Sequence, residues 1–270
     1  YDPLVFAQYF GNLAISTACE AWLGPNYQMT AQVNLVRPSG AAQSPHRDYH
    51  LGFQPRDMAA NYPAHVHDLS PVLTLQGAVI HADMPIESGP TKLLPFSQIY
   101  RHGYLAFTQP DFRAYFEAHH VQVPLSKGDV LFFSPALYHA GGANVSHDIQ
   151  RMANLLQVSS AFGRAMETLD RRDMTSRLYQ VLSTKDHGLS SWQVDAAISA
   201  CAEGYSFPTN LDTDPPIGGL APETQAALCR RALSGRMSQT DFAPPPTAPA
   251  ARHLSYPYRS PPPHSPADPL

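Results

Sequence analysis

Four residues from two distant regions of the sequence constrain the fold of this chain more than any other feature. His46 and Asp48 are separated by one residue, whereas His139 and Arg151 come much later. Residues i and i+2 of an extended segment point to the same side, so His46 and Asp48 can reach one metal ion together. A ligand as distant as His139 can join them only if a later strand runs beside this segment. The four residues therefore predict a fold in which distant strands meet around a metal.

The segments that carry His139 and Arg151 have the patterns of strands. Residues 129–133 are a short, mostly apolar run after a turn-rich tetrapeptide, and the chain beyond His139 is rich in glycine, which suits a tight reversal. Residues 150–159 then alternate between two faces, one of which carries Arg151. On adjacent antiparallel strands, the Arg151 guanidinium would point into the same cavity as the metal. Because a buried arginine needs an anion, this cavity should bind one.

The residue types indicate which metal is bound. Two imidazoles and one carboxylate can occupy one triangular face of an octahedral Fe(II), which leaves three positions for a chelating molecule and dioxygen. A solitary His-x-Asp pair carries little information in a chain with 13 histidines. The distal histidine before a glycine-rich turn and the arginine on the next strand make the combination specific for a mononuclear iron site.

Together, these residues resemble the phytanoyl-CoA dioxygenase family of Fe(II)/2-oxoglutarate-dependent oxygenases. The resemblance rests on the His-x-Asp pair, on the distal histidine with its glycine-rich turn, and on the arginine beyond it. Residues 24–26 and 87–97 are similar to the family's segments ahead of the first long strand and between the two iron-binding strands. The resemblance covers residues 22–162.

Helix start and stop signals beyond residue 163 predict a C-terminal helical appendix. The resemblance implies the rest of the fold, an all-β core with flanking helices, arranged as a double-stranded β-helix (a jelly-roll, cupin-like barrel). Two patterns agree with it: residues 28–37 alternate as a strand with one packed face does, and residues 71–82 are nearly continuous in apolar residues, as a strand covered on both faces would be. We expect an oxygenase domain with an N-terminal helix over residues 1–162, a helical appendix over 163–240, and a proline-rich, disordered tail over 241–270.

Capping signals and apolar spacing predict the helices. The first begins at the Asp2-Pro3 start signal and runs until Gly24 stops it. A short helix is expected just before the last iron-binding strand, and three more in the appendix. These four are predicted over residues 110–120, 164–183, 190–203 and 222–234.

The resemblance also implies an activity, namely hydroxylation of a small molecule by an Fe(II)- and 2-oxoglutarate-dependent dioxygenase. His46, Asp48 and His139 would hold the iron, and 2-oxoglutarate would chelate it while its distal carboxylate pairs with Arg151, a bidentate pairing that lysine cannot reproduce. The cosubstrate would be converted to succinate and carbon dioxide. Family members that halogenate replace the aspartate with a small residue, so Asp48 favours hydroxylation.

Other polar and aromatic residues are candidates for the same cavity. Strand polarity and the resemblance select possible contacts to 2-oxoglutarate and a possible rim of the substrate pocket. The cosubstrate contacts are Asn34, Gln76, Thr91 and Ser97, and the pocket residues are Tyr49, His50 and Phe53.

Two alternatives remain open at this point. His65 and His67 are also two residues apart, and a cupin-like metalloenzyme that ignores 2-oxoglutarate could use them. The chain could also be a catalytically inert barrel that acts as a binding module. Arg151 separates the first alternative from the oxygenase hypothesis, because only the oxygenase hypothesis requires it.

Composition limits the partners. With 18 basic and 22 acidic residues, a net charge of −4 and no basic run, the chain of 270 residues is not expected to bind nucleic acid. No apolar stretch reaches the length of a membrane span, and the start of the chain lacks the pattern of a signal peptide. It begins at Tyr1 without methionine, which is typical of a processed or partial sequence. Three widely spaced cysteines favour a reducing cytoplasm. The sequence leaves the oligomeric state open.

Overall fold

The structure, a computed structural model, describes residues 2–48, 50–184, 186–209, 215–216, 218 and 220–242. It combines helices with two antiparallel sheets. The helices are α1 (Pro3–Phe10), α2 (Leu13–Leu23), α3 (Arg56–Ala59), α4 (Ala64–Val72), α5 (Gly103–Ala106), α6 (Pro110–His119), α7 (Arg171–Leu182), α8 (Ser191–Cys201), α9 (Gln225–Ser234) and α10 (Gln239–Phe242). The strands are β1 (Gln28–Val36), β2 (Thr74–Ile80), β3 (Lys92–Leu93), β4 (Val121–Gln122), β5 (Val130–Phe133), β6 (His139–Ala140) and β7 (Arg151–Ser159).

The larger sheet has the strand order β1, β7, β2, β5. In its register, Val36 lies opposite Arg151, Asn34 opposite Ala153, and Gln76 opposite Gln157. Directly opposed residues of antiparallel strands share a face, and so do alternate residues along one strand. Arg151, Asn34 and Gln76 therefore lie on the same face of this sheet.

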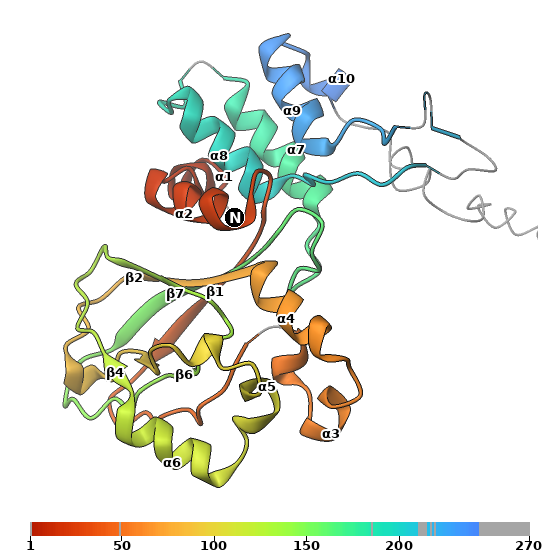
Figure 1. The fold of residues 1–270 in the computed structure, drawn as a ribbon. Helices are drawn as coiled ribbons and strands as arrows, with labels where there is room; N and C mark the ends of the chain where they lie inside the picture. The colour runs from red at the N-terminus through yellow and green to blue at the C-terminus, as the bar shows by residue number, and fades with distance from the viewer. Residues whose placement is uncertain are drawn as a thin grey trace, which may run out of the picture.

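The opposite face of the larger sheet is covered by helices. Apolar residues of β1, β2 and β7 pack there against α1, α2 and α8, and Figure 1 shows these helices on one side of the sheet. The buried members of this cluster are Phe10, Ile15, Cys19, Tyr27, Met29, Leu75, Val79, Leu156, Val158 and Ala200. One face of the sheet thus forms a core with helices, while the other remains available for polar side chains.

The smaller sheet has the order β4, β3, β6. The segment at His46 extends it, because the backbone nitrogen of His46 donates to the His139 carbonyl (3.0 Å) and the nitrogen of His139 donates to the His46 carbonyl (3.1 Å). The prediction that the segment of His139 runs beside the segment of His46 is therefore confirmed. The described strands form two separate antiparallel sheets and no closed barrel, so this part of the fold prediction is not observed directly.

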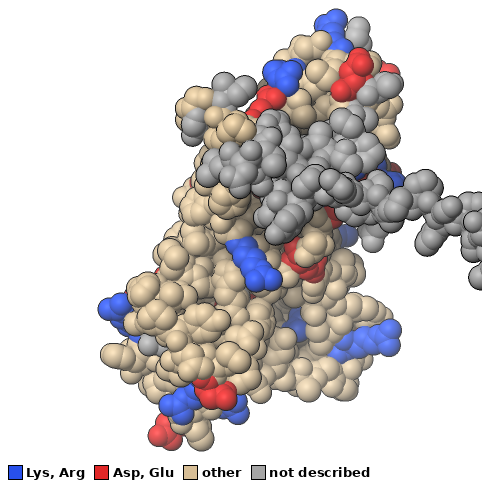
Figure 2. Space-filling view, turned by 90° about the vertical axis from the view of Figure 1, so that its right-hand side faces the viewer, with Lys and Arg blue, Asp and Glu red and all other residues tan. Residues whose placement is uncertain are grey.

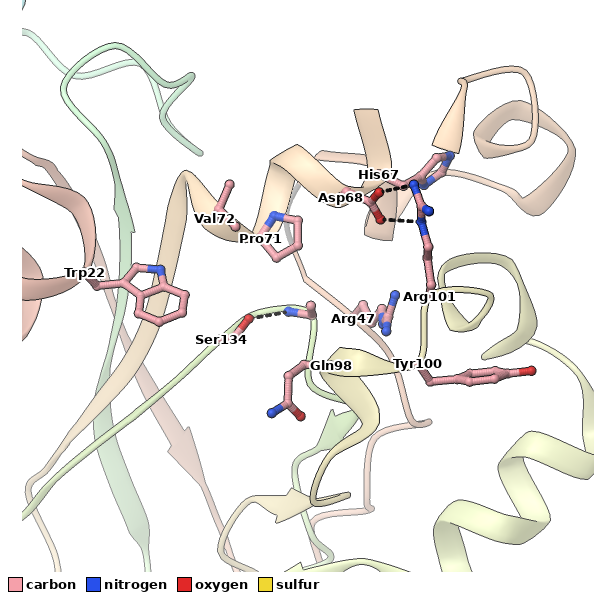
Figure 3. Close-up of a pocket in the computed structure, with 11 residues that line it drawn as sticks. Trp22, Arg47, His67, Asp68, Pro71, Val72, Gln98, Tyr100, Arg101 and Ser134 are labelled. Atoms are coloured by element: carbon pink, nitrogen blue, oxygen red, sulfur yellow. Dashed lines mark hydrogen bonds and ion pairs between the residues drawn. The ribbon is translucent and has the colours of Figure 1, made fainter. Parts of the chain in front are cut away.

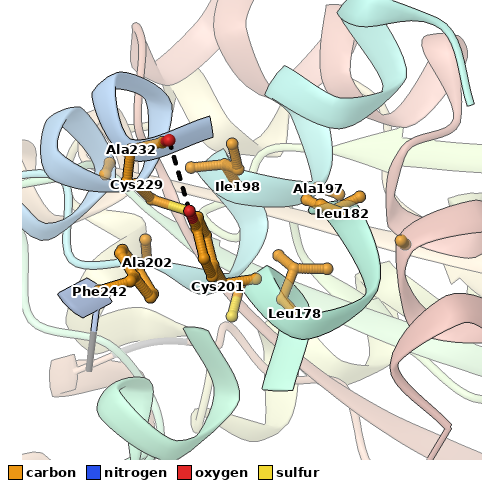
Figure 4. Close-up of a cluster of buried hydrophobic side chains, with 12 residues drawn as sticks. Leu178, Leu182, Ala197, Ile198, Cys201, Ala202, Cys229, Ala232 and Phe242 are labelled. Atoms are coloured by element: carbon orange, nitrogen blue, oxygen red, sulfur yellow. Dashed lines mark hydrogen bonds between the residues drawn. The ribbon is translucent and has the colours of Figure 1, made fainter. Parts of the chain in front are cut away.

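The C-terminal helices have a core of their own. It is formed mainly by side chains of α7, α8 and α9, with Phe242 of α10 stacked on Tyr179 at a centroid distance of 3.8 Å (Figure 4). Ala7 of α1 is fully buried in the same cluster. The first helix of the chain is therefore packed with the predicted appendix as well as with the sheet. The division of the chain into an oxygenase domain, a helical appendix and a tail, with boundaries at residues 162 and 240, stays a prediction. Residues 243–270 of the predicted tail lie outside the described residues.

Two helix predictions need correction. The single helix expected from Asp2-Pro3 to Gly24 is two helices, because the side chain of Asn12 accepts hydrogen bonds from the backbone nitrogens of Ala14 (2.9 Å) and Ile15 (3.4 Å) and starts a second one. The helix expected over 164–183 begins only at Arg171, where Asp170 caps it. The helices expected over 110–120, 190–203 and 222–234 are present within a few residues.

The strand expected over 71–82 also begins later than predicted. Pro71 is still inside α4, and β2 starts at Thr74. All of β2 is buried, which confirms the prediction that this strand is covered on both faces. Helices α3, α4 and α5 and the short α10 had no clear signal in the sequence.

The described residues include no helix that is both long enough and apolar enough to cross a membrane. On the face shown in Figure 2, charged side chains are scattered among uncharged ones and form no continuous basic surface among the residues drawn in colour.

Candidate metal centre

His46, Asp48 and His139 converge, with one potential ligand atom from each lying within 4.8 Å of the others. The carboxylate of Asp48 lies between the two rings. Its Oδ1 is 3.4 Å from Nε2 of His46, and its Oδ2 is 3.3 Å from Nε2 of His139. The ring centroids of the two histidines are 4.6 Å apart. All three donors are nitrogen or oxygen, a set that suits a divalent first-row metal.

Backbone carbonyls orient both imidazoles. Nδ1 of His46 lies 2.7 Å from the Ser44 carbonyl, and Nδ1 of His139 lies 2.8 Å from the Leu137 carbonyl. Because a carbonyl can only accept a hydrogen bond, a neutral ring must carry its proton on Nδ1. Nε2 of each ring faces Asp48, and Nε2 of His139 lies within hydrogen-bond distance of Oδ2 (3.3 Å). A metal would take the place of any proton on Nε2, which is the arrangement of metal-binding histidines whose second nitrogen is held by a hydrogen bond.

The ionisation of the three groups also suits a metal. Burial is the main effect that lowers the pKa of His46, and the neighbouring His139 lowers it further, so the ring stays neutral. Burial alone would raise the pKa of the Asp48 carboxyl. The hydrogen bond and charge of His139, with smaller contributions from His46 and Gln76, outweigh this effect and hold the pKa below its usual value. Asp48 is therefore ionised at neutral pH.

Gln76 connects the two sheets at this point, because its side-chain nitrogen donates a hydrogen bond to Oδ2 of Asp48. The sequence suggested Gln76 as a cosubstrate contact, whereas the structure places it on the proposed metal ligand itself. Phe133, which lies opposite Gln76 on β5, packs edge-on against His139 with centroids 4.9 Å apart. Nothing in the sequence had distinguished Phe133 from the other apolar residues of its strand.

Arg151 is 8% exposed and lies on the site face of the larger sheet. Its Nη1 donates to the carbonyls of Ser88 (3.3 Å) and Gly142 (3.0 Å). Among the described residues no carboxylate lies within ion-pair distance of this guanidinium, and burial lowers its pKa. A buried arginine that contacts only carbonyls leaves a positive charge without a counter-ion, so the surroundings of Arg151 favour an anion.

Strand register places two of the other predicted cosubstrate contacts, Asn34 and Thr91. Asn34 is on the face of β1 that also bears Val36, the residue opposite Arg151. Thr91 directly precedes β3, where Leu93 pairs with His139 and Lys92 extends to Glu117 of α6 (2.7 Å). Since residues alternate, Thr91 shares the face of Leu93 and not that of Lys92.

Ser97 does not have a free hydroxyl for a cosubstrate. Its Oγ donates to the Leu94 carbonyl (2.7 Å) and accepts from the backbone nitrogen of Tyr138 (2.8 Å). The hydroxyl therefore stabilises the turn that follows β3 and connects it to Tyr138, the residue before β6. The structure gives Ser97 this local role in place of the predicted one.

The histidines of the cupin-like alternative do not form a site. His65 and His67 lie on α4 and not on a strand. His65 is exposed, whereas His67 is buried and its Nε2 lies 3.0 Å from the Ala59 carbonyl. Residues two apart on a helix point in different directions, so the pair cannot bind one ion together.

The residues expected to line a substrate pocket are arranged differently. The two ring nitrogens of His50 contact the Ser70 hydroxyl (2.7 Å) and the Arg164 carbonyl (3.3 Å). Phe53 is 53% exposed. Tyr49 lies outside the described residues.

Comparisons with known proteins are consistent with this site. A family model described as phytanoyl-CoA dioxygenase (PhyH) matches residues 2–153. Similar solved structures include the epimerase SnoN from nogalamycin biosynthesis in complex with Fe3+, alpha ketoglutarate and nogalamycin RO (22% identity, 57% of this chain and 58% of that chain covered, TM-score 0.41). Another is AviO1 from Streptomyces viridochromogenes Tue57 (18% identity, 57% and 61% covered, TM-score 0.40).

The chain spans little more than half the length of SnoN, for which a second structure gives 22% identity, 55% of that chain covered and a TM-score of 0.39. The comparison with curated proteins gives no match. The family model, in contrast, covers more than half of the chain and includes His46, Asp48, His139 and Arg151. This protein belongs to the phytanoyl-CoA dioxygenase family.

Proposed function

We propose that the protein is an Fe(II)- and 2-oxoglutarate-dependent dioxygenase that hydroxylates a small molecule. One observation carries the proposal: a His-Asp-His cluster contacts, through Gln76, the sheet face that also bears Arg151, a buried arginine that has no carboxylate partner among the described residues. Family membership supports the same activity. The proposed ligands are His46, Asp48 and His139, and the proposed anchor of 2-oxoglutarate is Arg151.

We also propose that the two sheets form a double-stranded β-helix. With the His46 segment added next to β6, successive strands alternate between the sheets except at the β3–β4 step. The larger sheet then has the order β1, β7, β2, β5 and the smaller one the order His46 segment, β6, β3, β4. Two facing four-stranded sheets with such crossovers are the plan of a jelly-roll.

Iron with bound 2-oxoglutarate and dioxygen would supply the oxidant for hydroxylation, with conversion of 2-oxoglutarate to succinate and carbon dioxide. The chain's own contribution is to hold two neutral imidazoles and one carboxylate in place. The carbonyls of Ser44 and Leu137 set the orientation of the rings, and Gln76 holds the carboxylate. These contacts prepare the site before the metal arrives.

Charge accounting supports 2-oxoglutarate as the anion. Fe(II) with ionised Asp48 has a net charge of +1, and Arg151 adds another positive charge. A dianion with a chelating end and a distal carboxylate neutralises both. Thr91 and Asn34 are proposed to donate hydrogen bonds to the same molecule, because they border the face on which Arg151 lies.

An anaerobic titration tests the proposal. Fe(II) and 2-oxoglutarate are added to the metal-free protein, and the visible charge-transfer band of the chelate is recorded for wild type, His46→Ala and Arg151→Ala. We expect a band that disappears in His46→Ala and requires far more 2-oxoglutarate in Arg151→Ala. His65→Ala is the matched histidine control and should behave as wild type, because His65 is exposed and outside the cluster.

Other outcomes lead to other functions. A folded, iron-binding protein that shows no band would favour a metalloenzyme that does not use 2-oxoglutarate. A folded protein that binds no iron at all would favour an inert barrel that acts as a binding module. Loss of the band in His65→Ala would contradict the assignment of the ligands.

A further inference from the structure

A separate cavity of about 430 Å³ lies next to the proposed metal centre. Trp22, Pro71 and Val72 form an apolar wall, and Tyr100 lies on the other side (Figure 3). Arg47 points into the space between them. The volume is in the range of pockets that hold small organic molecules.

This cavity is connected to the metal centre. A smaller cavity of about 30 Å³ is lined by both Arg47 and Asp48 and shares Pro71 and Ala136 with the large one. Neither cavity is lined by Arg151. The large cavity therefore opens toward Asp48 from a different direction than the proposed position of 2-oxoglutarate.

Arg47 is the middle residue of the His-x-Asp pair. In an extended segment its side chain leaves the backbone on the side opposite to His46 and Asp48, so it cannot be a ligand to the metal. The guanidinium lies over the ring of Tyr138, with Cζ 4.8 Å from the centroid, and Nη2 donates to the Ser97 carbonyl (3.0 Å). These two contacts hold the guanidinium at the cavity wall.

The positive charge of Arg47 is not compensated. Its Nε is buried without a hydrogen-bond partner, and in the described part of the chain no carboxylate forms an ion pair with it. The other charges that line the large cavity cancel, because Arg101 binds Asp68 through two hydrogen bonds of 2.5 and 3.3 Å. An arginine carries five donors, and among the described residues one hydrogen bond from the Arg47 side chain is present, to the Ser97 carbonyl.

We propose that Arg47 anchors an oxyanion, a carboxylate or a phosphate ester, on a prime substrate whose apolar body lies against Trp22, Pro71 and Val72. This proposal rests on the proposed oxygenase function, and it adds the chemical class of the substrate. Arg47 would hold the anionic end of the molecule beside the small cavity that Asp48 also lines, which keeps the substrate next to the proposed metal centre. The reaction itself is the hydroxylation proposed above.

Probes that share a benzyl group and differ in their polar end test this proposal. Phenylacetate, benzyl phosphate and neutral phenylacetamide have similar apolar bodies, and ligand-observed NMR titration gives their dissociation constants for the metal-free protein. We expect wild type to prefer at least one anion over the amide by about tenfold or more, the usual effect of a hydrogen bond to a charged group. The better of the two anions distinguishes a carboxylate from a phosphate substrate.

Four variants test whether the preference for an anion depends on Arg47. Arg47→Gln should reduce it to about one, and Arg47→Lys should retain part of it. The double variant Asp68→Asn/Arg101→Gln removes two charges of opposite sign from the same cavity, so the net charge is unchanged and the preference should persist. Arg151→Gln should also retain it, because Arg151 lines neither cavity.

The proposal is overturned if wild type binds both anions no more tightly than phenylacetamide, or if neither anion binds at millimolar concentration. It is also overturned if the preference for an anion survives in folded Arg47→Gln. If Arg47→Gln does not fold, the outcome for folded Arg47→Lys and the loss of the preference at high salt decide. Failure of the iron and 2-oxoglutarate titration would leave these results unchanged, because the probes are measured without metal. The two proposals can therefore fail independently.

Discussion

The exchange Arg151→Lys tests the proposed anchor of 2-oxoglutarate without removing its charge. In the structure, Nη1 of Arg151 donates to the carbonyls of Ser88 and Gly142. The edge formed by Nη2 and Nε is left for a carboxylate, which it can bind through two parallel hydrogen bonds. Lysine has a single nitrogen and cannot contact both carbonyls and both carboxylate oxygens.

The expected loss follows from this count of hydrogen bonds. Lysine retains the charge and one hydrogen bond to the carboxylate but loses the second. A hydrogen bond to a charged group contributes about 1.5–3 kcal/mol, so the dissociation constant of 2-oxoglutarate should rise roughly 10- to 150-fold. Binding of Fe(II) should be unchanged, because Arg151 is not a member of the His-Asp-His cluster.

Anaerobic titration of 2-oxoglutarate into the iron-loaded variant, followed by visible absorption, measures this shift. Arg171→Lys is the matched control, because Arg171 is also largely buried but pairs with Glu203 (3.8 Å) in the helical part of the chain. Thermal unfolding verifies that both variants are folded. Equal affinities for wild type and Arg151→Lys, or equal losses in the two variants, would refute the role given to Arg151.

Three further predictions concern the metal ligand, the sheet and the buried thiols. Gln76→Leu should weaken metal binding by roughly 10- to 100-fold, because Asp48 loses the hydrogen-bond donor that orients it. Titration with Co(II) measures the affinity for the metal. An equal loss of affinity in Gln157→Leu, a change on the same sheet face, would contradict the role of Gln76. Gly77→Ala should cost about 1–3 kcal/mol of unfolding free energy, since its Cβ would lie 2.6 Å from the Phe132 ring; urea unfolding checks this, and Phe132→Leu in the same chain should recover part of the loss. Burial raises the pKa of Cys19 and Cys229 to about 12 and that of Cys201 to about 11. The unfolded chain ionises its thiols near their usual pKa of about 8.5, so above that value each thiol should lower the unfolding free energy by roughly 1.4 kcal/mol per pH unit, up to its folded pKa. Urea midpoints that are equal at about pH 8 and about pH 10 would show that the thiols are not buried as described.

The parts of the site that could be predicted are those that the chemistry of individual residues specifies. His46, Asp48 and His139 were recognised because few arrangements of residues bring two imidazoles and a carboxylate together, and the structure places them within 4.8 Å. The face of Arg151 followed from strict alternation along β7. Their roles as iron ligands and cosubstrate anchor stay proposals until the titration is made.

Other features depend on contacts that periodicity does not reveal. The break between α1 and α2 is made by the Asn12 side chain, which competes with a continuous helix through a local hydrogen bond. The apolar run that includes Pro71 and β2 contains both a helix end and a strand, and composition alone cannot divide it.

The cavity around Arg47 could not be predicted either, for a different reason. Its walls come from segments that are distant in the sequence, around Trp22, residues 67–72, 98–101 and 134–136. No local pattern connects them. The contact between Gln76 and Asp48 could not be predicted from the strand pattern, because it depends on how closely the two sheets approach each other.

The position of β7 determines when this protein can become functional during synthesis. β1 pairs only with β7 among the described strands, and β7 also lies between β1 and β2. β1 therefore remains unpaired along its edge during synthesis until β7 has been translated. Because loop closure over such a distance is slow, the nascent chain exposes a sheet edge during that interval. We expect chaperone dependence in the cell to be governed by this delay and not by the stability of the finished molecule.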